Sequence, residues 1–296
     1  MAMKKVPLAR EIMEPWVAVA QSSRLVNDVL SQIGEPLPGS NFEWVNAHYP
    51  FERSSDWCRE FLAAALEHMQ LWADHVAPLR FHEEAEVIHT FRPVQTLSRA
   101  AIEAASQAVW VMDGGTASEC ARRHVCLVLD DLDQQRKAAQ SEERKNHLKA
   151  ARQLLLERLQ SDISEKDIGQ FPGYMNIVKE AAATVAAKGT VDADLAHPEV
   201  VERLWRASAG SAHGKRWPSL ELQFVNPEEE ISPGQFATDR IPDPAAITHI
   251  LNLAGSILSY GVLRFADYSG YTPQLGKILA TAGENLGAII PRRADA

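Results

Sequence analysis

Residues 198–214 read PEVVERLWRASAGSAHG, a stretch that carries both the start and the stop signals of an α-helix. The start lies at His197–Pro198, or slightly earlier at Asp194, because proline is tolerated at the first position of a helix. Gly214 is placed to end the helix, since glycine readily adopts the left-handed conformation that follows a helix C-terminus. The stretch therefore predicts a single helix that ends at Gly214.

Arg206 and His213 are the residues of this helix that point to chemistry. Seven steps of about 100° return a helix to within roughly 20° of its starting direction, so both side chains are expected on one face. Gly210, one turn after Arg206, is expected on the same face, where it removes side-chain bulk. Ser208 and Ser211 flank this glycine with hydroxyl groups, so a phosphate group or a second helix could approach the face closely.

The end of this helix gathers positive charge. His213 lies at the helix C-terminus, where the helix dipole favours a protonated imidazole, and Lys215 and Arg216 follow directly. An arginine that binds a phosphate, beside a histidine that transfers protons, suffices for cleavage of RNA without a metal or cofactor. The pair also has a structural interpretation, in which Arg206 and His213 bind carboxylates or carbonyls of a neighbouring helix in a buried polar layer.

Apolar residues at three- and four-residue spacing, with capping signals at the ends of the segments, predict helices along the rest of the chain. Ser54 or Ser55 is available as the N-cap of one of them. Thr116, three residues before Glu119, matches a capping box and begins one long helix, or two in near-continuity, with a charged, solvated middle. The helices are expected at 8–33, 54–76, 94–112, from 116 onward, and at 174–188, 198–213, 245–267 and 273–290. The fold class is therefore predicted to be an all-α bundle.

Two segments interrupt the helical pattern. Residues 34–53 contain three prolines and four aromatic residues, which favours an ordered loop packed on the body. Residues 214–244 contain five prolines and an alternation of Leu220, Leu222 and Phe224 that could form a short strand or hairpin. We therefore expect a structured excursion after the helix that carries Arg206 and His213.

Length, composition and charge narrow the classes of function. The chain has 296 residues, 46% of them hydrophobic, which is enough for one large or two ordinary domains. A formal net charge of -9 gives no global reason to bind nucleic acid or an anionic membrane, so phosphate chemistry would need a local basic patch. The three separated cysteines indicate neither disulfides nor a zinc site, and we recognise no signal peptide and no apolar stretch approaching the ~20 residues of a membrane span. A cytoplasmic protein without a membrane partner is expected.

The segment Arg206-x6-His213, at the end of a helix and followed by glycine, resembles the Arg-x4-6-His motif of the HEPN superfamily. The stretch LWRASAGSAHG also resembles an Arg/Tyr-x-x-Ser-x-x-x-His-Gly segment in a group of bacterial helical proteins, with Ala209 at the position of the serine. Those proteins commonly carry an Arg-x-x-x-Glu pair on an earlier helix, and Arg99 and Glu103 occupy the corresponding place. The resemblance covers about residues 92–269 and implies a HEPN-like helical domain over 92–296, with residues 1–91 as a helical segment packed on it.

The resemblance implies a metal-independent endoribonuclease of toxin or phage-defence type, commonly a dimer. It implies that Arg206 binds phosphate, that His213 is the acid or base, and that RNA and an antitoxin or regulatory protein are partners. Arg99 and Glu103 would face this helix, with the glutamate orienting an arginine or histidine. Many active relatives place a polar residue after the motif arginine, where this chain has Ala207. The alternative is a catalytically inactive scaffold or partner-binding protein that uses the same seam for dimerisation.

Another group of residues is spaced for metal binding. His82, Glu86 and His89 fall at positions that would share one face of a helix, and these residue types are common metal ligands. The adjacent Glu83–Glu84 is more typical of an ordinary solvated helix start, and a di-iron centre would need further carboxylates. The main hypothesis therefore includes no metal.

Cys120 and His124 lie one turn apart and could in principle form a nucleophile and base. On so apolar a helix, Cys120 and Cys126 are better interpreted as small core residues. Trp57, Phe61 and Trp72 recur at helical spacing without interleaved basic residues, which favours a core stripe over a platform for stacking bases.

Overall fold

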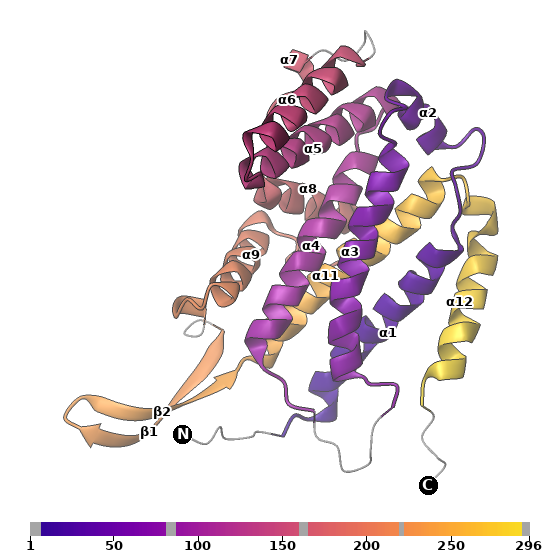
Figure 1. Ribbon diagram of the computed structural model, residues 1–296. Helices are drawn as coiled ribbons and strands as arrows, with labels where there is room; N and C mark the ends of the chain where they lie inside the picture. The colour runs from indigo at the N-terminus through magenta and orange to yellow at the C-terminus, as the bar shows by residue number, and fades with distance from the viewer. Residues whose placement is uncertain (1–6, 81–86, 160–164, 219–221, 292–296) are drawn as a thin grey trace.

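The computed structural model describes residues 7–80, 87–159, 165–218 and 222–291. Within these ranges the chain forms eleven α-helices, a short 3-10 helix and a two-stranded hairpin, which confirms the predicted all-α class (Figure 1). The helices are α1 (Arg10–Gln32), α2 (Asn41–His48), α3 (Ser54–Val76), α4 (Phe91–Met112), α5 (Ala117–Ala138), α6 (Glu142–Glu157), α7 (Glu165–Ile168), α8 (Tyr174–Ala187), α9 (Pro198–Ala212), α11 (Pro244–Tyr268), η1 (Thr272–Gln274) and α12 (Leu275–Ile289). The strands are β1 (Gln223–Ser232) and β2 (Gln235–Pro242).

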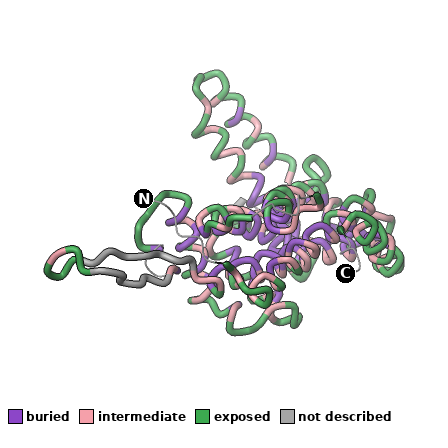
Figure 2. The backbone as a smooth tube through the Cα atoms, turned by 90° about the horizontal axis from the view of Figure 1, so that it is seen from below, coloured by how far each residue is buried: buried purple, intermediate pink, exposed green. Residues whose placement is uncertain are grey.

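The centre of the bundle is the contact between α4 and α11. Helices α1 and α3 pack on this pair, and α8 and α9 pack on α4. Ala101, Ala105 and Ala108 of α4 are fully buried, so small side chains allow the close approach of neighbouring helices. On α11, a Cβ atom at Gly261 would lie 2.8 Å from Leu62 Cδ2. Figure 2 shows the buried residues running through the middle of the molecule, with exposed residues around them.

One hydrophobic cluster connects the N-terminal helices to the rest of the chain. It joins Trp16 of α1 and Leu62 of α3 to Ile102 of α4, Phe265 of α11 and Ile278 of α12. The helices before and after α4 therefore share one core, while the domain boundary near residue 91 stays a prediction.

Helix α11 corrects the expectation that no apolar stretch approaches the length of a membrane span. Positions 244–263 hold no Asp, Glu, Lys or Arg. The 25-residue helix is long and apolar enough to cross a membrane by length and composition alone. In the structure 56% of its most apolar window is buried, and it packs on α1, α3, α4 and α8. This is the environment of a core helix, and such helices share the composition of membrane spans.

The charged segment after Thr116 forms two helices that fold back on each other as a hairpin, so the expectation of one long helix is wrong, and the two helices of the alternative do not continue in one line. Helix α5 ends at Ala138, and α6 begins at Glu142 and packs beside α5 (Figure 1). The hydroxyl of Thr116 accepts a hydrogen bond from the Glu119 backbone N–H, as the capping box predicts. Leu148 and Leu155 are the buried residues of α6, and its charged residues lie toward solvent. The prediction of a solvated, charged stretch is therefore confirmed.

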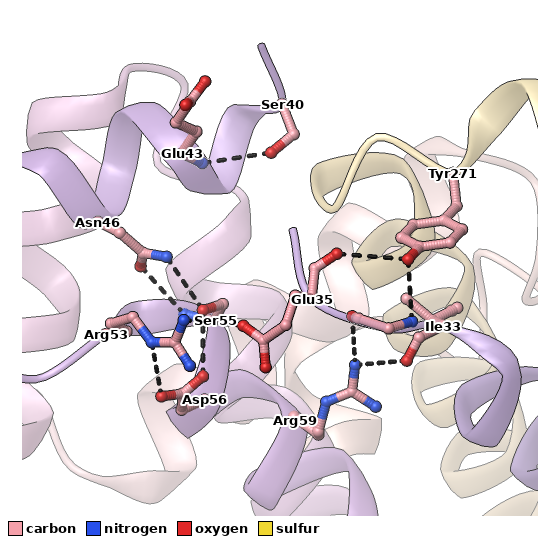
Figure 3. Close-up of polar contacts among 11 residues, drawn as sticks. Ile33, Glu35, Ser40, Glu43, Asn46, Arg53, Ser55, Asp56, Arg59 and Tyr271 are labelled. Atoms are coloured by element: carbon pink, nitrogen blue, oxygen red, sulfur yellow. Dashed lines mark hydrogen bonds and ion pairs between the residues drawn. The ribbon is translucent and has the colours of Figure 1, made fainter. Parts of the chain in front are cut away.

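The segment 34–53, expected to be a loop, contains the two-turn helix α2. Ser40 caps this helix, because its hydroxyl accepts a hydrogen bond from the Glu43 backbone N–H (Figure 3). The side chain of Glu43 in turn accepts from the Gly39 N–H at 2.5 Å. These contacts satisfy amide groups that the first turn of a helix leaves without a partner.

Helix α3 begins as predicted, although neither Ser54 nor Ser55 is its N-cap. Arg53 occupies the cap position without a side-chain hydrogen bond. Asn46 of α2 donates to the Ser55 hydroxyl at 3.0 Å and accepts from the Ser55 backbone N–H at 3.3 Å (Figure 3). The acceptor for this first-turn N–H therefore comes from Asn46 of the neighbouring helix, where the sequence led us to expect a serine hydroxyl.

The chain after α1 is tied to distant parts of the fold by polar contacts (Figure 3). Arg59 of α3 donates to the carbonyl of Ile33 at 2.7 Å and to that of Gly34 at 2.9 Å. The hydroxyl of Tyr271, which lies just before η1, accepts from the Gly34 N–H at 3.1 Å and donates to the Glu35 carbonyl at 3.3 Å. An irregular segment near the N-terminus is thereby fixed to the C-terminal helices.

The excursion after α9 contains the antiparallel hairpin β1–β2, which confirms the predicted hairpin. The hairpin extends away from the helices in Figure 1. Leu222, just before β1, is buried with Ala207 of α9 and Ala246 of α11. Leu220 lies outside the described residues. The root of the hairpin is therefore packed on the body next to the candidate site.

Candidate functional site

Helix α9 lies against α4 and α8 and presents its remaining side to solvent. It begins at the predicted Pro198, where the His197 ring accepts a hydrogen bond from the Glu199 N–H at 3.4 Å. It buries Val201 and Leu204 in the core. Arg206 and His213 are both exposed, so they do not form the buried polar layer that was considered as an alternative.

Arg206 is held in an ion-pair cluster between α8 and α9. Its Nε donates to Glu202 Oε1 at 2.8 Å, and Lys179 of α8 binds the other carboxylate oxygen. The hydrogen bonds from Lys179 and then Arg206 lower the pKa of Glu202 below its ordinary value. Since Glu202 lies one turn toward the helix N-terminus, the guanidinium of Arg206 points away from His213.

His213 occupies the C-cap of α9 within a well-formed helix end. The backbone N–H of Lys215 donates to the Gly210 carbonyl at 2.7 Å, and that of Gly214 donates to the Ser211 carbonyl at 3.1 Å. This pair of bonds is a Schellman motif, and Gly214 has the positive φ of 67° that the motif requires. The sequence prediction for the end of the helix is therefore confirmed.

Three cationic side chains surround this end of the helix. Arg92 of α4 donates to the carbonyl of Lys215 at 3.4 Å. Lys215 and Arg216 are exposed beside His213, as the sequence led us to expect. Cations are favoured here because the last carbonyls of a helix carry partial negative charge. The C-terminal end of α9 thus carries a local basic patch on an acidic protein.

The small and hydroxyl-bearing residues of α9 do not line an open surface, contrary to expectation. Ser208 is buried and donates to the Leu204 carbonyl at 2.8 Å, while Ser211 is buried and donates to Gln95 of α4. A Cβ atom at Gly210 would lie 2.7 Å from Pro218 Cγ. The chain after the helix folds back over this glycine, so no phosphate group could approach it.

Arg99 and Glu103 face α9, where they contact a tryptophan and neither Arg206 nor His213. Glu103 Oε1 binds Arg99 at 2.9 Å and accepts a hydrogen bond from Trp205 Nε1 at 2.6 Å. The Arg99 guanidinium lies 4.5 Å from the centre of the Trp205 ring. This cluster fixes the position of α9 on α4 and so acts on the exposed face only through the backbone of the helix.

Sequence reasoning missed Lys179, Glu202, Trp205 and Arg92. The spacing of Glu202 and Arg206 is a signal that was available, since residues four apart on a helix are neighbours. The other partners come from α8 and α4, and nothing in the local pattern of α9 indicates them.

The proposed metal ligands are not brought together in the part of the chain that is described. His82 and Glu86 lie outside the described residues, and His89 lies in the non-helical segment before α4. The His89 ring packs against Trp16 at 5.2 Å and His75 at 5.6 Å between ring centres. Burial lowers the pKa of His89. The described residues include no group of three potential metal ligands.

Cys120 and Cys126 are buried core residues, as interpreted from the sequence, and His124 is buried with them. The Cys120 thiol lies 3.8 Å from the Tyr268 hydroxyl, and burial raises its pKa, which disfavours a reactive thiolate. His124 donates to the Glu52 carbonyl at 2.8 Å, and burial lowers its pKa to about 4. The Cys120–His124 pair therefore has the environment of packing residues.

The aromatic stripe on α3 is also part of the core. Trp72 is 2% exposed, and the half-buried Trp57 and Phe61 pack on the main hydrophobic cluster with their ring centres 5.8 Å apart. These rings are occupied by packing, as expected.

The geometry defines an all-α protein with an exposed arginine and histidine on one helix and a basic patch at the end of that helix. Comparison with known protein families, with curated proteins and with solved structures finds no match for this chain. The HEPN relationship therefore stays a resemblance that rests on Arg206-x6-His213.

Proposed function

We propose that the chain is a metal-independent endoribonuclease that uses the exposed face of α9. The observation that carries the proposal is the exposure of His213 beside the cations Arg92, Lys215 and Arg216. A histidine needs contact with solvent and substrate to transfer protons, and the cations would hold the phosphodiester close to it.

In the proposed reaction, the 2′-oxygen of a ribose forms a bond to the adjacent phosphorus while the bond from phosphorus to the 5′-oxygen breaks. A base removes the proton of the 2′-hydroxyl, and an acid donates a proton to the 5′-oxygen. Arg206 would stabilise the charge that develops on the phosphate. Its exposed pair with Glu202 is a weak restraint, because water screens ion pairs at a surface.

A dimer would complete this site. The helical rise of about 1.5 Å per residue separates the backbones of Arg206 and His213 by roughly 10 Å. The Arg206 side chain extends in the opposite direction, toward Glu202. A two-fold axis beside α9 would place the arginine of one copy near the histidine of the other, so that a dimer would hold two sites, each with one Arg206 and with one His213 as the acid or the base.

The proposal is tested by incubating a mixed RNA substrate in EDTA with wild-type protein and with the variants Arg206→Ala and His213→Ala. Loss of an acid–base group lowers such rates by about 10²–10⁴-fold. Arg203→Ala and His147→Ala are matched controls, because both residues are exposed and lie outside the proposed site. Equal activity of site and control variants, or no cleavage by folded wild type, would exclude the proposed role of Arg206 and His213.

The second candidate is a catalytically inactive scaffold that uses the same face for dimerisation or for a protein partner. The ion pairs of Glu202 with Lys179 and Arg206 favour it, since they give Arg206 a partner within the chain. This candidate predicts that Arg206→Glu changes the molar mass measured by light scattering while wild-type protein leaves RNA intact.

A further inference from the structure

Trp217 is an exposed tryptophan that follows directly on the basic end of α9. It is 36% exposed, and the other exposed tryptophan, Trp44 of α2, is 61% exposed. The remaining tryptophans of the chain are buried or half-buried. Helix α2 lies at the upper right of Figure 1, whereas α9 lies at the left. Trp217 is therefore the exposed tryptophan that belongs to the candidate site.

The indole of Trp217 contacts α9 between Arg206 and His213. A Cβ atom at Gly210 would lie 3.1 Å from Trp217 Nε1 and 2.7 Å from Pro218 Cγ. Arg206, Gly210 and His213 follow one another at intervals of four and three residues, so helix geometry places them in one row along α9. The glycine in the middle of this row makes room for the indole, and an exposed aromatic ring thus lies on the face that carries the arginine and the histidine.

The protein gives Trp217 few specific contacts of its own. Trp205, by comparison, donates a hydrogen bond to Glu103 and lies against the Arg99 guanidinium at 4.5 Å. Within the described ranges, Trp217 Nε1 donates no hydrogen bond, and the indole contacts neither another aromatic ring nor a cation. A large apolar ring in contact with water is a favourable place for a second flat ring to bind, because stacking removes both surfaces from water.

The neighbours of Trp217 suit a ligand that carries phosphate groups beside a flat ring. Lys215 and Arg216 precede it and are exposed, and His213 is exposed at the C-cap of α9. Cations beside an aromatic ring are typical of sites for single-stranded nucleic acid, where the cations follow the backbone and the ring stacks on a base. Stacking needs no excess of positive charge, so it does not depend on how Glu221, which lies outside the described residues, affects the local balance.

We propose that Trp217 binds an unpaired base of the RNA substrate by stacking and thereby places the adjacent phosphodiester at His213. The identity of the ligand as RNA rests on the proposed function of the α9 face. A base inside a double helix is stacked between its neighbours and does not reach the indole, so Trp217 selects strands with unpaired bases.

The test measures binding of a short, fluorescently labelled single strand of 2′-O-methyl RNA by anisotropy. This strand has bases and phosphates but no 2′-hydroxyl to attack phosphorus, so binding is measured without cleavage. Trp217→Leu keeps apolar bulk over Gly210 and should weaken binding about 5- to 150-fold, which corresponds to the loss of one base stack. Trp217→Phe keeps an aromatic ring and should bind more tightly than Trp217→Leu. Trp44→Leu, at the other exposed tryptophan, is the matched control and should bind as wild type does.

Two further strands separate stacking from attraction by charge. One is the same strand annealed to its complement, and the other is an abasic strand with the same number of phosphates. Wild type should bind both more weakly than the single strand, and Trp217→Leu should leave the affinity for both unchanged. Added salt weakens contacts between cations and phosphates, so it should lower all affinities while the ratio between wild type and Trp217→Leu changes little.

Three results would overturn the proposal. The first is equal affinity of folded wild type and Trp217→Leu for the single strand, which includes the absence of binding by both. The second is equal affinity of wild type for the single and the abasic strand. The third is a lower molar mass of Trp217→Leu by light scattering with unchanged affinity for the strand, which would assign the indole to a protein contact. Circular dichroism of each variant confirms that the helices are intact.

The same variants separate this proposal from the ribonuclease proposal. If the 2′-O-methyl strand binds in a way that depends on Trp217 while RNA stays intact, the base site stands and the ribonuclease proposal fails. If RNA is cleaved with dependence on His213 and Trp217→Leu has the KM of wild type, the base site alone fails.

Discussion

Glu103 connects α4 to α9 through two different partners, since one carboxylate oxygen binds both Arg99 and the Trp205 indole. Its side chain is 20% exposed, so water replaces these contacts poorly. We predict that Glu103→Gln lowers the free energy of unfolding by about 1.5–3 kcal/mol, the range for hydrogen bonds to charged groups. Urea denaturation measures the change. The exposed Glu67→Gln on α3 is the control and should stay within about 0.5 kcal/mol of wild type.

His124 makes stability depend on pH. Its pKa is lowered to about 4 in the fold by burial, while an unfolded histidine titrates near 6.5. Between these values the unfolded chain binds the proton and the folded chain does not, so stability falls as pH falls from about 6.5 toward 4. We predict a loss of about 2 kcal/mol from this group between about pH 7 and pH 5.

The measurement is urea unfolding of wild type and His124→Gln at both pH values, because the difference between the two proteins isolates His124 from the other histidines. Glutamine keeps a donor for the Glu52 carbonyl. A pH dependence that is unchanged in the variant would contradict the assignment to His124.

Single residues also mark the limit of sequence reasoning at the site. The position of Gly214 followed from its conformational freedom, which is a local property. Ser208 and Ser211 were expected near an open face, and the structure buries both. Which side of α9 meets α4 is a matter of tertiary packing, and the spacing of two candidate residues does not determine it.

At the scale of elements, alanine substitutions at Gly210 and Gly283 should change the free energy of unfolding in opposite directions. Both lie in helices, where alanine has a higher helix propensity than glycine. Gly283 on α12 has nothing within 4 Å of its Cβ position, so Gly283→Ala should raise stability by about 0.5–1 kcal/mol. At Gly210 the added methyl meets the Pro218 ring, so Gly210→Ala should lower stability by about 1–3 kcal/mol.

Thermal or urea unfolding of Gly210→Ala and Gly283→Ala measures whether each alanine raises or lowers stability. Equal stabilisation by both alanines would mean that the chain at Trp217–Pro218 does not rest on α9.

Most helices could be predicted because their signals are local. Apolar periodicity, Pro198, Gly214 and the Thr116 cap each act within one or two turns, and the boundaries they predict agree with the structure. Helix α2 was missed because its apolar pattern is short and surrounded by prolines. The turn between α5 and α6 was missed because neither glycine nor proline marks residues 139–141.

At the scale of the whole molecule, the proposed site needs two copies of the chain. If the arginine and the histidine act from different copies, a mixed dimer of Arg206→Ala and His213→Ala chains contains one intact site. We predict that mixing the two inactive variants restores about a quarter of wild-type RNA cleavage, since half of the dimers are mixed and each has one of two sites.

The two variants are mixed after denaturation and refolding together, and light scattering reports the dimer. If the mixture contains mixed dimers and still does not cleave RNA, then Arg206 and His213 of the same chain act together in one site.

The most direct measurement is the identity of the RNA ends after incubation of wild-type protein with RNA in EDTA. Attack by the 2′-oxygen leaves a 2′,3′-cyclic phosphate on one product and a 5′-hydroxyl on the other. We predict both ends with wild type and neither with His213→Ala. Intact RNA in the presence of folded wild-type protein, or products with 3′-hydroxyl ends, would contradict the proposed function of the α9 face.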